Sequence, residues 1–467
     1  MANPSSLLRS IPSVNELLDS PPLRGLVERV NRNVVVTGVR GFLDRFREEV
    51  KSRAEDLPLP TASELAERIA SWISATEPVG LRRVINATGL PLHTGLGRAP
   101  LADEALQAVC DVSRGYSNLE VDIATGERSQ RVAAVEPLLN QLLGSEAAVV
   151  VNNNAAATLL VLTALSHGKE AVVSRGHLIE IGGNFRLPEV MTASGARLRE
   201  VGTTNKTRLS DFAQAIGPET GVLLKVHPSN YVVCGFTEQP TLEELVELGR
   251  RRGVPVIDDI GSGAIDDFAA YGLHDEPTAK DSLRAGADVC LFSGDKLLGG
   301  PQCGIIVGKR ELLAKIANHP LMRALRVDKM TLAALAATLK LHLRDVSGRE
   351  AVPLIGLLAT STENLRNRAE RLAPQLAASA AVAAAEAVAG TTFLGGGSVP
   401  TQEIPTWCVA LRPVSGSVDE LAARLRKGEP SVFGRIQRDR LLLDLRAVLP
   451  REDVDLVAAV TALTPLP

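Results

Sequence analysis

The sequence predicts an α/β protein built around a mostly parallel sheet. Between residues 81 and 330, short apolar and β-branched runs alternate with stretches of helical periodicity. Such alternation is typical of a parallel sheet covered by helices on both faces. Helices such as 155–166 and 242–251 separate the predicted strands, which are 147–151, 170–174, 198–201, 221–226, 254–258, 289–293 and 304–307. A chain of 467 residues is also too long for one core, so we expect two or three domains.

The regions on either side of this one predict two smaller domains. Residues 1–55 carry apolar side chains at helical spacing and predict a helical unit, and residues 56–80 predict a linker helix after a proline-rich break. Residues 331–467 begin with a helical run and continue with many glycines and prolines, which predicts a small α+β domain. The alanine-rich stretch 377–390 lacks the uncharged length of a membrane helix, so we expect a helix of that small domain.

Composition narrows the classes of function. Apolar residues make up 45% of the chain and charged residues 22%, which fits a globular protein with a filled interior. The net charge of −3 argues against wholesale coating by nucleic acid, although residues 1–53 hold nine Lys and Arg against six Asp and Glu. This local excess of basic residues fits either a solvated helix surface or a local nucleic-acid contact. Charge alone favours the solvated surface.

The N-terminus and the cysteines indicate a reduced compartment. The first residues lack a basic segment followed by an apolar one, so no signal peptide is expected. The five cysteines form no C-x-x-C pair, and the seven histidines show no ligand spacing. We therefore expect no disulfide framework, no metal site, no membrane association and a cytoplasmic location.

A single lysine lies in a turn of small residues between two predicted strands. Residues 290–304 read CLFSGDKLLGGPQCG, and the turn carries Lys296. Desolvation lowers the pKa of a buried lysine and frees its amine for Schiff-base chemistry. Ser293 lies where its hydroxyl could reach a cofactor phosphate. A solvated lysine in a surface turn is the alternative, and this run alone does not decide between the two.

An acidic pair ends an earlier predicted strand. Residues 254–263 read VPVIDDIGSG, which places Asp258 and Asp259 at the carboxyl edge of the sheet, where α/β proteins bind ligands. A pyridoxal enzyme needs a carboxylate there to keep the pyridine nitrogen protonated, and the glycines after Asp259 make it the better candidate. Binding of Mg²⁺ and capping of a helix are alternatives. The spacing of 37 residues from Asp259 to Lys296 favours the cofactor.

A phosphate cradle is predicted where a strand passes directly into a helix. Residues 149–158 read VVVNNNAAAT, so free backbone N–H groups and the positive end of a helix dipole meet near Asn153, Asn154 and Ala155. Many strand-to-helix turns look similar, and this signal is weak alone. No P-loop or dinucleotide-binding glycine pattern competes for the role.

Further runs, spread over nearly the whole chain, match one protein family. They are RSIPSV (9–14), RVINATG (83–89), LHTGLGR (92–98), GYSNLE (115–120), SRG (174–176), EIGGNFR (180–186), GTTNKT (202–207), KVH (225–227), SNY (229–231), GFTE (235–238) and LRVDK (325–329). With the Asp259 and Lys296 runs, they make the chain resemble the bacterial selenocysteine synthases, or L-seryl-tRNA(Sec) selenium transferases. The resemblance implies a fold-type I pyridoxal-phosphate transferase with a mostly parallel central sheet, a small α+β C-terminal domain and a small helical N-terminal domain.

The resemblance also implies a reaction and its residues. Family members convert seryl-tRNA(Sec) to selenocysteinyl-tRNA(Sec): water is eliminated from the serine, and selenium from selenophosphate adds to the β-carbon. Lys296 would hold pyridoxal 5′-phosphate and take the Cα proton, and Asp259 would face the ring nitrogen. The implied cofactor-binding residues are Lys296, Asp259, Ser293, Asn153, Asn154, Ala155, His177 and His227. His177 departs from the family, which usually has an acid or amide there; its imidazole could stack on the cofactor ring or simply pack.

The partners follow from the resemblance as well. Arg98, Arg323 and Arg326 match arginines that the family uses for selenophosphate, and the i,i+3 spacing of the last two predicts one shared helix face. Surface arginines in caps or ion pairs are the alternative. The N-terminal helices would bind the tRNA, and family members assemble as homo-oligomers built from dimers, a decamer by analogy.

Two rival functions belong to other classes. A pyridoxal lyase of the same superfamily would act on a small amino acid or an amino sugar phosphate, but such relatives tend to lack a helical unit like residues 1–55. A non-catalytic tRNA-binding protein would retain only a vestigial cofactor fold. The intact set of Ser293, Lys296 and Asp259 argues against that decay.

Overall fold

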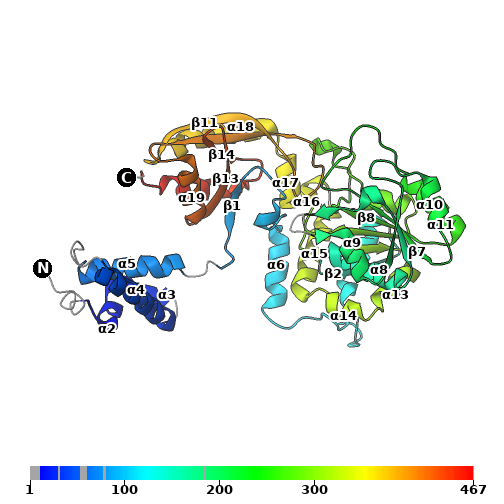
Figure 1. The fold of residues 1–467 in the computed structure, drawn as a ribbon, viewed down its shortest axis with the longest axis horizontal. Helices are drawn as coiled ribbons and strands as arrows, with labels where there is room; N and C mark the ends of the chain where they lie inside the picture. The colour runs from blue at the N-terminus through cyan, green and yellow to red at the C-terminus, as the bar shows by residue number, and fades with distance from the viewer. Residues whose placement is uncertain (1–10, 30–31, 53–59, 77–79, 182–184, 466–467) are drawn as a thin grey trace. The chain divides into compact units, whose positions relative to one another are not determined.

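The computed structural model describes residues 11–29, 32–52, 60–76, 80–181 and 185–465, and Figure 1 shows their fold. The chain divides into two compact units, residues 1–83 and 84–467. Residues 9–10 and 182–184, which belong to the runs that match the family, lie outside the described residues.

The N-terminal unit is a helical bundle. Its helices are α2 (Val14–Leu18), α3 (Pro21–Arg29), α4 (Arg32–Ser52) and α5 (Ala62–Thr76). Ser13 begins α2 with a reciprocal capping box to Glu16. The apolar stripe of α4, which includes Val39 and Leu43, is fully buried in the core of this unit.

Helix α5 was predicted as a linker, and the structure corrects this. Leu65, Ile69 and Ile73 lie four residues apart on one face of α5, and all three are buried in the same core as α3 and α4. The periodicity was visible in the sequence, but the partner against which that face packs was not. The helical unit therefore includes α5.

The second unit contains a seven-stranded sheet with the strand order β2-β10-β9-β8-β7-β3-β6. Strands β3, β6, β7, β8 and β9 pair in parallel, and β10 runs antiparallel to both of its neighbours. The strands are β2 (Ala147–Val151), β3 (Glu170–Ser174), β6 (Arg197–Val201), β7 (Thr220–Val226), β8 (Val256–Gly261), β9 (Val289–Ser293) and β10 (Gly304–Gly308). The prediction of a mostly parallel sheet is confirmed, with every strand found within two or three residues of its expected bounds.

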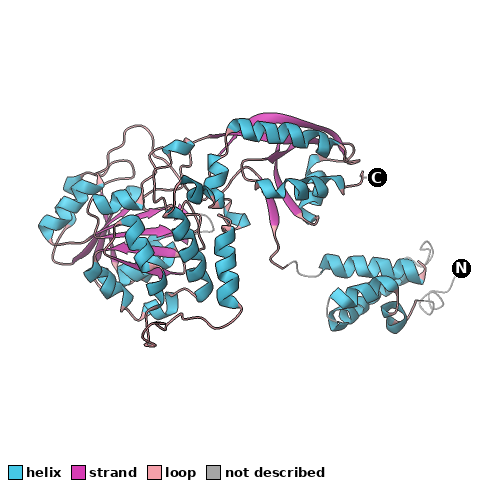
Figure 2. Ribbon diagram, turned by 180° about the vertical axis from the view of Figure 1, so that it is seen from behind, coloured by secondary structure: helices cyan, strands magenta, loops and turns pink. Residues whose placement is uncertain are grey.

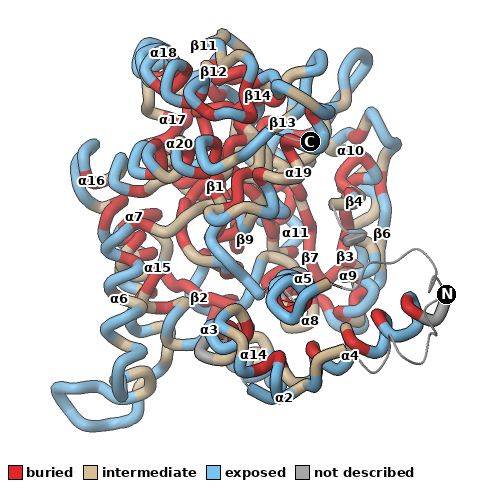
Figure 3. The backbone as a smooth tube through the Cα atoms, turned by 90° about the vertical axis from the view of Figure 1, so that its left-hand side faces the viewer, coloured by how far each residue is buried: buried red, intermediate tan, exposed pale blue. Residues whose placement is uncertain are grey.

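Helices cover both faces of this sheet, as Figure 2 shows. One face packs against α8 (Asn154–Ser166), α9 (Leu187–Ala193) and α13 (Arg310–Ala317). The other packs against α7 (Glu136–Leu143), α10 (Leu209–Ala215), α11 (Leu242–Arg252), α12 (Ala279–Arg284) and α15 (Lys329–His342). Strands β2, β9 and β10 are buried along their whole length. Figure 3 draws buried residues in red. Burial on both faces explains why these strands read as continuous apolar runs.

A five-stranded sheet with the order β1-β13-β14-β12-β11 forms the core of the smaller domain. Its elements are β1 (Val84–Ala87), α18 (Thr362–Ala377), β11 (Val382–Thr392), β12 (Ile404–Pro413), α19 (Val418–Lys427), β13 (Ser431–Gln437), β14 (Arg440–Asp444) and α20 (Asp453–Thr461). Strand β1 pairs in parallel with β13, although the sequence assigned residues 81–330 to the large domain. A single short strand carries no signal of which sheet it joins.

The boundary expected at residue 331 also needs correction. Helix α15 packs on the large sheet through Leu332, Leu335 and Leu339, so it belongs to the core of the large domain. The remaining short elements of this unit are α6 (Asp103–Ser113), β4 (Glu180–Ile181), β5 (Phe185–Arg186), α14 (Leu321–Leu325), α16 (Val346–Glu350) and α17 (Pro353–Ala359).

The alanine-rich stretch 377–390 is not a helix. Helix α18 ends at Ala377, and β11 pairs with β12 in a long antiparallel ladder from Val382↔Pro413 to Thr392↔Ile404. Alanine has the highest intrinsic helix propensity, but its advantage over most other residues is less than about 1 kcal/mol per residue, and pairing in a ladder of this length overrides it. None of the described helices is long and apolar enough to cross a membrane. All five cysteines are free.

We predict that Ile69→Ala lowers the stability of the N-terminal unit. Ile69 is fully buried between helices, and truncation of such a side chain typically costs about 2–5 kcal/mol. Hydrogen exchange of α3 and α4 should become markedly faster. The control is Glu67→Ala, an exposed position on the same helix, which should leave their exchange rates unchanged. Unchanged protection in Ile69→Ala would mean that α5 is a linker after all.

Candidate active site

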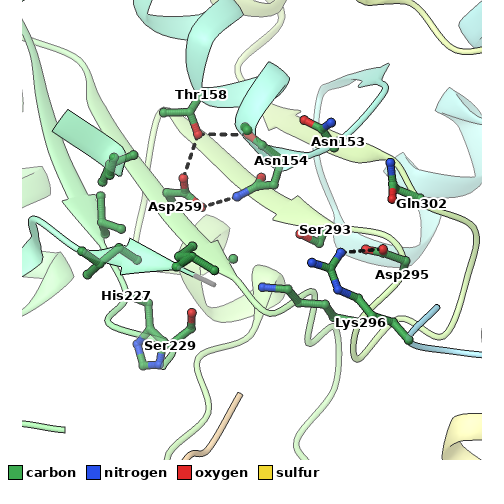
Figure 4. Close-up of a pocket in the computed structure, with 17 residues that line it drawn as sticks. Asn153, Asn154, Thr158, His227, Ser229, Asp259, Ser293, Asp295, Lys296 and Gln302 are labelled. Carbon is green, nitrogen blue, oxygen red and sulfur yellow. Dashed lines mark hydrogen bonds and ion pairs between the residues drawn. The ribbon is translucent and has the colours of Figure 1, made fainter. Parts of the chain in front are cut away.

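The three predicted elements converge at one edge of the large sheet. Strands β2, β8 and β9 point the same way, so their carboxyl ends meet there, as ligand sites of α/β proteins do. A cavity of about 240 Å³ opens at this edge. Figure 4 shows the amine of Lys296 pointing into it, opposite the carboxyl of Asp259. Seven of the predicted cofactor residues line the cavity: Lys296, Asp259, Ser293, Asn153, Asn154, Ala155 and His227.

Lys296 lies in a turn that backbone hydrogen bonds hold rigid. The N–H of Gly294 donates to the carbonyl of Cys303 (2.9 Å), and the N–H of Gly299 donates to that of Lys296 itself (2.8 Å). Gly263 has a φ of 75°, and a Cβ there would lie 2.2 Å from the carbonyl oxygen of Ser293. Only glycine therefore allows the β8 loop to approach the end of β9 so closely.

The environment of Lys296 favours its neutral amine. The residue is only 6% exposed, and burial lowers the pKa of its ammonium group. The positive charge of Arg98 lowers that pKa further, while Asp259 and Asp295 oppose the shift. A neutral amine is the form that attacks a carbonyl carbon or accepts a proton.

Asp259 is held by two side chains of helix α8. Its carboxylate accepts a hydrogen bond from Asn154 Nδ2 at 2.8 Å and another from Thr158 Oγ1 at 3.0 Å. Burial raises the pKa of Asp259 to about 6, and these two bonds act in the opposite direction. A cationic group bound in front of the carboxylate would favour its charged form.

Asp258 points to the other side of β8, as alternation along a strand requires. It accepts a hydrogen bond from Ser282 Oγ at 2.7 Å, and Lys225 Nζ lies 4.0 Å away. It does not line the cavity, which fits the structural role expected for it.

The start of helix α8 offers an anion-binding site. The Asn153 side chain caps the helix by accepting the N–H of Ala156 at 2.8 Å. The N–H groups of Asn154 and Ala155 precede the first intrahelical bonds and lie at the cavity. A Cβ on Gly304 would lie 2.2 Å from the carbonyl oxygen of Asn153, so glycine is needed for this approach too.

These groups fit pyridoxal phosphate. A buried amine, a carboxylate that two donors orient, a helix N-terminus and the hydroxyl of Ser293 surround one cavity. In addition, Asn154 Oδ1 is buried and has no hydrogen-bond partner among the described residues, which leaves an acceptor for a bound group. The part of the chain that the structure describes holds no group of His, Cys, Asp and Glu side chains that could bind a metal ion.

The two histidines behave differently. His227 lines the cavity, whereas His177 does not. His177 is 2% exposed, with Nδ1 accepting the N–H of Val226 at 3.5 Å and Nε2 lying 3.3 Å from Gln239 Oε1. Burial lowers the pKa of both imidazoles to about 4, so both are neutral at pH 7. Of the two roles left open for His177, the structure favours packing over stacking on a cofactor.

The three predicted arginines do not meet within one chain. Arg98 lines the cavity, with a φ of 62° and an ion pair from Nη1 to Asp295 Oδ2 at 2.7 Å. Arg323 and Arg326 line a different cavity of about 570 Å³. Helix α14 ends before Arg326, which has an extended backbone and lies 3.4 Å from Glu120 Oε1. The expectation that Arg323 and Arg326 share a helix face is therefore wrong.

Four further polar side chains of the cavity escaped the sequence analysis: Thr158, Ser229, Asp295 and Gln302. Thr158 follows Asn154 by one helical turn, so helical spacing could have found it. Asp295 adjoins Lys296 and could have been considered with it. No helical spacing and no neighbouring site residue points to Gln302 or Ser229, because loops bring them to the site.

Comparisons with known proteins support these observations. The model of a family described as L-seryl-tRNA selenium transferase matches residues 84–449, and one described as selenocysteine synthase N terminal matches residues 8–47. The L-seryl-tRNA(Sec) selenium transferase of Moorella thermoacetica is 48% identical over 455 residues, which cover 97% of this chain and 96% of the relative. That of Geobacter sulfurreducens is 46% identical over 468 residues and covers 99% of each.

Among solved structures, the chain is similar in fold to D-glucosaminate-6-phosphate ammonia-lyase. The TM-score is 0.57 at 21% identity, over 82% of this chain and 95% of that chain. This likeness shows the fold alone. Together with the sheet order and the helices on both faces, it confirms the fold class predicted for the chain, that of the fold-type I pyridoxal-phosphate enzymes.

We predict that Thr158→Val weakens pyridoxal phosphate binding most at low pH. Loss of the hydroxyl removes a bond that lowers the pKa of Asp259, so the carboxylate protonates at higher pH and loses its attraction for a protonated ring nitrogen. Titration by absorbance should show a larger loss of affinity at pH 6 than at pH 8. Thr163→Val, on the same helix but bonded to the Leu159 carbonyl, is the control and should not change this profile. Equal loss at both pH values would contradict the role of Thr158.

Proposed function

The chain belongs to the L-seryl-tRNA selenium transferase family, and from this premise we propose that it converts seryl-tRNA(Sec) to selenocysteinyl-tRNA(Sec) with pyridoxal phosphate held at Lys296. One observation carries the proposal: the buried amine of Lys296 and the buried carboxyl of Asp259 line the same cavity. The cytoplasm, where charged tRNA is made and used, is the proposed place of action.

The residues of the cavity divide the chemistry among them. Bound pyridoxal phosphate supplies an electron sink next to the Cα of the serine. Asp259 would favour a positive charge at the ring nitrogen, and Asn154 and Thr158 keep its carboxylate in place. The N-terminus of α8 and Ser293 would hold the phosphate. Lys296, with its lowered pKa, would take the Cα proton and return a proton to the β-hydroxyl, which would leave as water; selenium would then add to the β-carbon as its bond to the phosphorus of selenophosphate breaks.

Selenophosphate requires a cationic site, and Arg98 is the arginine within this cavity. Because Arg323 and Arg326 line another cavity of the same chain, all three can bind one anion only if two copies contribute. This supports the proposed homo-oligomer of dimers. The number of subunits, a decamer by family analogy, is part of that proposal.

The rival lyase activity has less support. The ammonia-lyase shares the fold at 21% identity. The selenium transferases align with nearly the whole length of the chain, at 44–48% identity. The match at residues 8–47 is independent of the cofactor site and falls in the helical unit, which we propose binds the tRNA.

We predict that the holoenzyme forms selenocysteinyl-tRNA when incubated with seryl-tRNA(Sec) and selenophosphate. Lys296→Ala should abolish both the visible absorption band of the bound cofactor and product formation, because none of the other described residues that line the cavity is a lysine. Its affinity for the tRNA should stay within about twofold of the wild type, since Lys296 is buried. Product formation by Lys296→Ala at the wild-type rate would overturn the assignment.

We predict that the double variant Arg32→Gln/Arg40→Gln binds tRNA more weakly. Both arginines are exposed on α4. Each phosphate contact that is lost should reduce the slope of log affinity against log salt concentration by about one unit. Filter binding at several salt concentrations measures this. Arg250→Gln/Arg251→Gln, on α11 of the other unit, is the control. If the two double variants behave alike, the N-terminal unit does not bind tRNA through this face of α4.

A further inference from the structure

A second cavity adjoins the one that holds Lys296. It has a volume of about 510 Å³ and is lined by Gly176 and by residues of three segments, 227–239, 274–276 and 399–402. His227 lines both cavities, so the two share a wall. The cofactor and the reacting carbon occupy the first cavity in the proposed function, which leaves the second without a ligand.

Glu276 is a partly buried acid of this second cavity whose carboxylate has no hydrogen-bond partner among the described residues. Both of its carboxylate oxygens are buried, and neither makes a hydrogen bond among the described residues. Burial raises the pKa of Glu276, and Ser262 Oγ and the N–H of Val399, which lie near it without hydrogen-bond geometry, act in the opposite direction. A buried carboxylate without donors is costly, so its presence indicates that a donor arrives from a ligand.

The location of Glu276 ties it to the active site. The backbone carbonyl of Ser262 accepts the N–H of Leu297, the residue after Lys296, at 2.9 Å. Glu276 lines the second cavity and Lys296 the first, and the two cavities meet at His227. A ligand of Glu276 therefore lies in the cavity that adjoins the reacting amine.

The composition of the cavity selects a neutral ligand that donates hydrogen bonds. Its three acids are Glu238, Asp275 and Glu276, and neither Lys nor Arg is among the residues that line it. A phosphate would be repelled there. Gln239 and Gln402 add amide groups, and Tyr231 adds an aromatic ring on which a base can stack. Gln402 is fixed in place, because its amide bonds to both the N–H (2.7 Å) and the carbonyl (2.6 Å) of His274.

We propose that this second cavity binds the terminal nucleoside of the charged tRNA, and that Glu276 accepts a hydrogen bond from the free hydroxyl of its ribose. An amino acid on tRNA is an ester of one hydroxyl of the terminal ribose, and the neighbouring hydroxyl stays free. When the serine carbon lies at Lys296, that ribose lies next to it, where the second cavity adjoins. The inference rests on the proposed function and adds to it a specific subsite.

The test compares two substrates in the holoenzyme: seryl-tRNA(Sec) ending in adenosine, and the same tRNA ending in 2′-deoxyadenosine and charged on its 3′-hydroxyl. A hydrogen bond to a carboxylate contributes about 10- to 100-fold, so the wild type should lose about that factor in kcat/KM on the deoxy substrate, mainly through KM. Glu276→Gln and Glu276→Ala should show the same loss on the normal substrate and almost no further loss on the deoxy one. The cofactor band should be unchanged in both variants, which verifies their fold.

Glu238→Gln is the matched control. Glu238 lines the same cavity, but its carboxylate already faces Arg208 at 3.3 Å and Lys206 at 3.8 Å. This variant should keep the full penalty for the deoxy substrate. If Glu276→Ala also keeps the full penalty, the subsite is wrong while the proposed function stands. If the wild type converts neither substrate, the proposed function fails and the subsite with it.

Discussion

The site depends on one constraint: an amine and a carboxyl that water would otherwise solvate are both buried at the same edge of the sheet. Lys296 is 6% exposed and Asp259 is 5% exposed, and each is charged in its ordinary state. Their burial requires close backbone approach, which Gly263 and Gly304 permit because a Cβ at either position would collide with a carbonyl oxygen. The cost of this burial falls when a group with complementary charges occupies the space between them.

Helix α8 connects the anion site to the carboxylate of Asp259. Its first N–H groups and its Asn153 cap form the anion site, and Asn154 and Thr158 on its first turns hold the carboxylate of Asp259. Phosphate and ring nitrogen of one cofactor would therefore both be positioned by this helix. Because α8 packs against β7, β9 and β10 in the core, the sheet holds in place the groups that would bind both ends of the cofactor.

Buried oxygens of two residues of the second unit, Asn154 and Glu276, lack hydrogen-bond partners in the part of the chain that the structure describes. The free oxygen of Asn154 faces the cofactor cavity, and the carboxyl of Glu276 faces the neighbouring one. Arg323 and Arg326 line a third cavity away from Arg98. Folded proteins rarely leave buried polar groups unsatisfied, so Asn154 and Glu276 mark where a cofactor and a nucleoside are proposed to bind. Arg323 and Arg326, of which Arg326 already pairs with Glu120, mark where a second copy of the chain is proposed to contribute.

The sequence by itself determined the seven strands of the large sheet and the mostly parallel pairing, and it singled out Lys296, Asp259 and the Asn153 turn, which the structure brings to one cavity. These follow from local patterns: apolar runs, strand-end acids and strand-to-helix turns. The tertiary structure alone decided that α5 packs into the bundle, that the alanine-rich β11 is a strand, and that β1 joins the small sheet. It also decided that His177 packs away from the cavity while Glu276 faces the one beside it. The physical reason is that burial and pairing involve residues distant in sequence, and a local pattern shows that a face is apolar or a group is polar without showing what it meets.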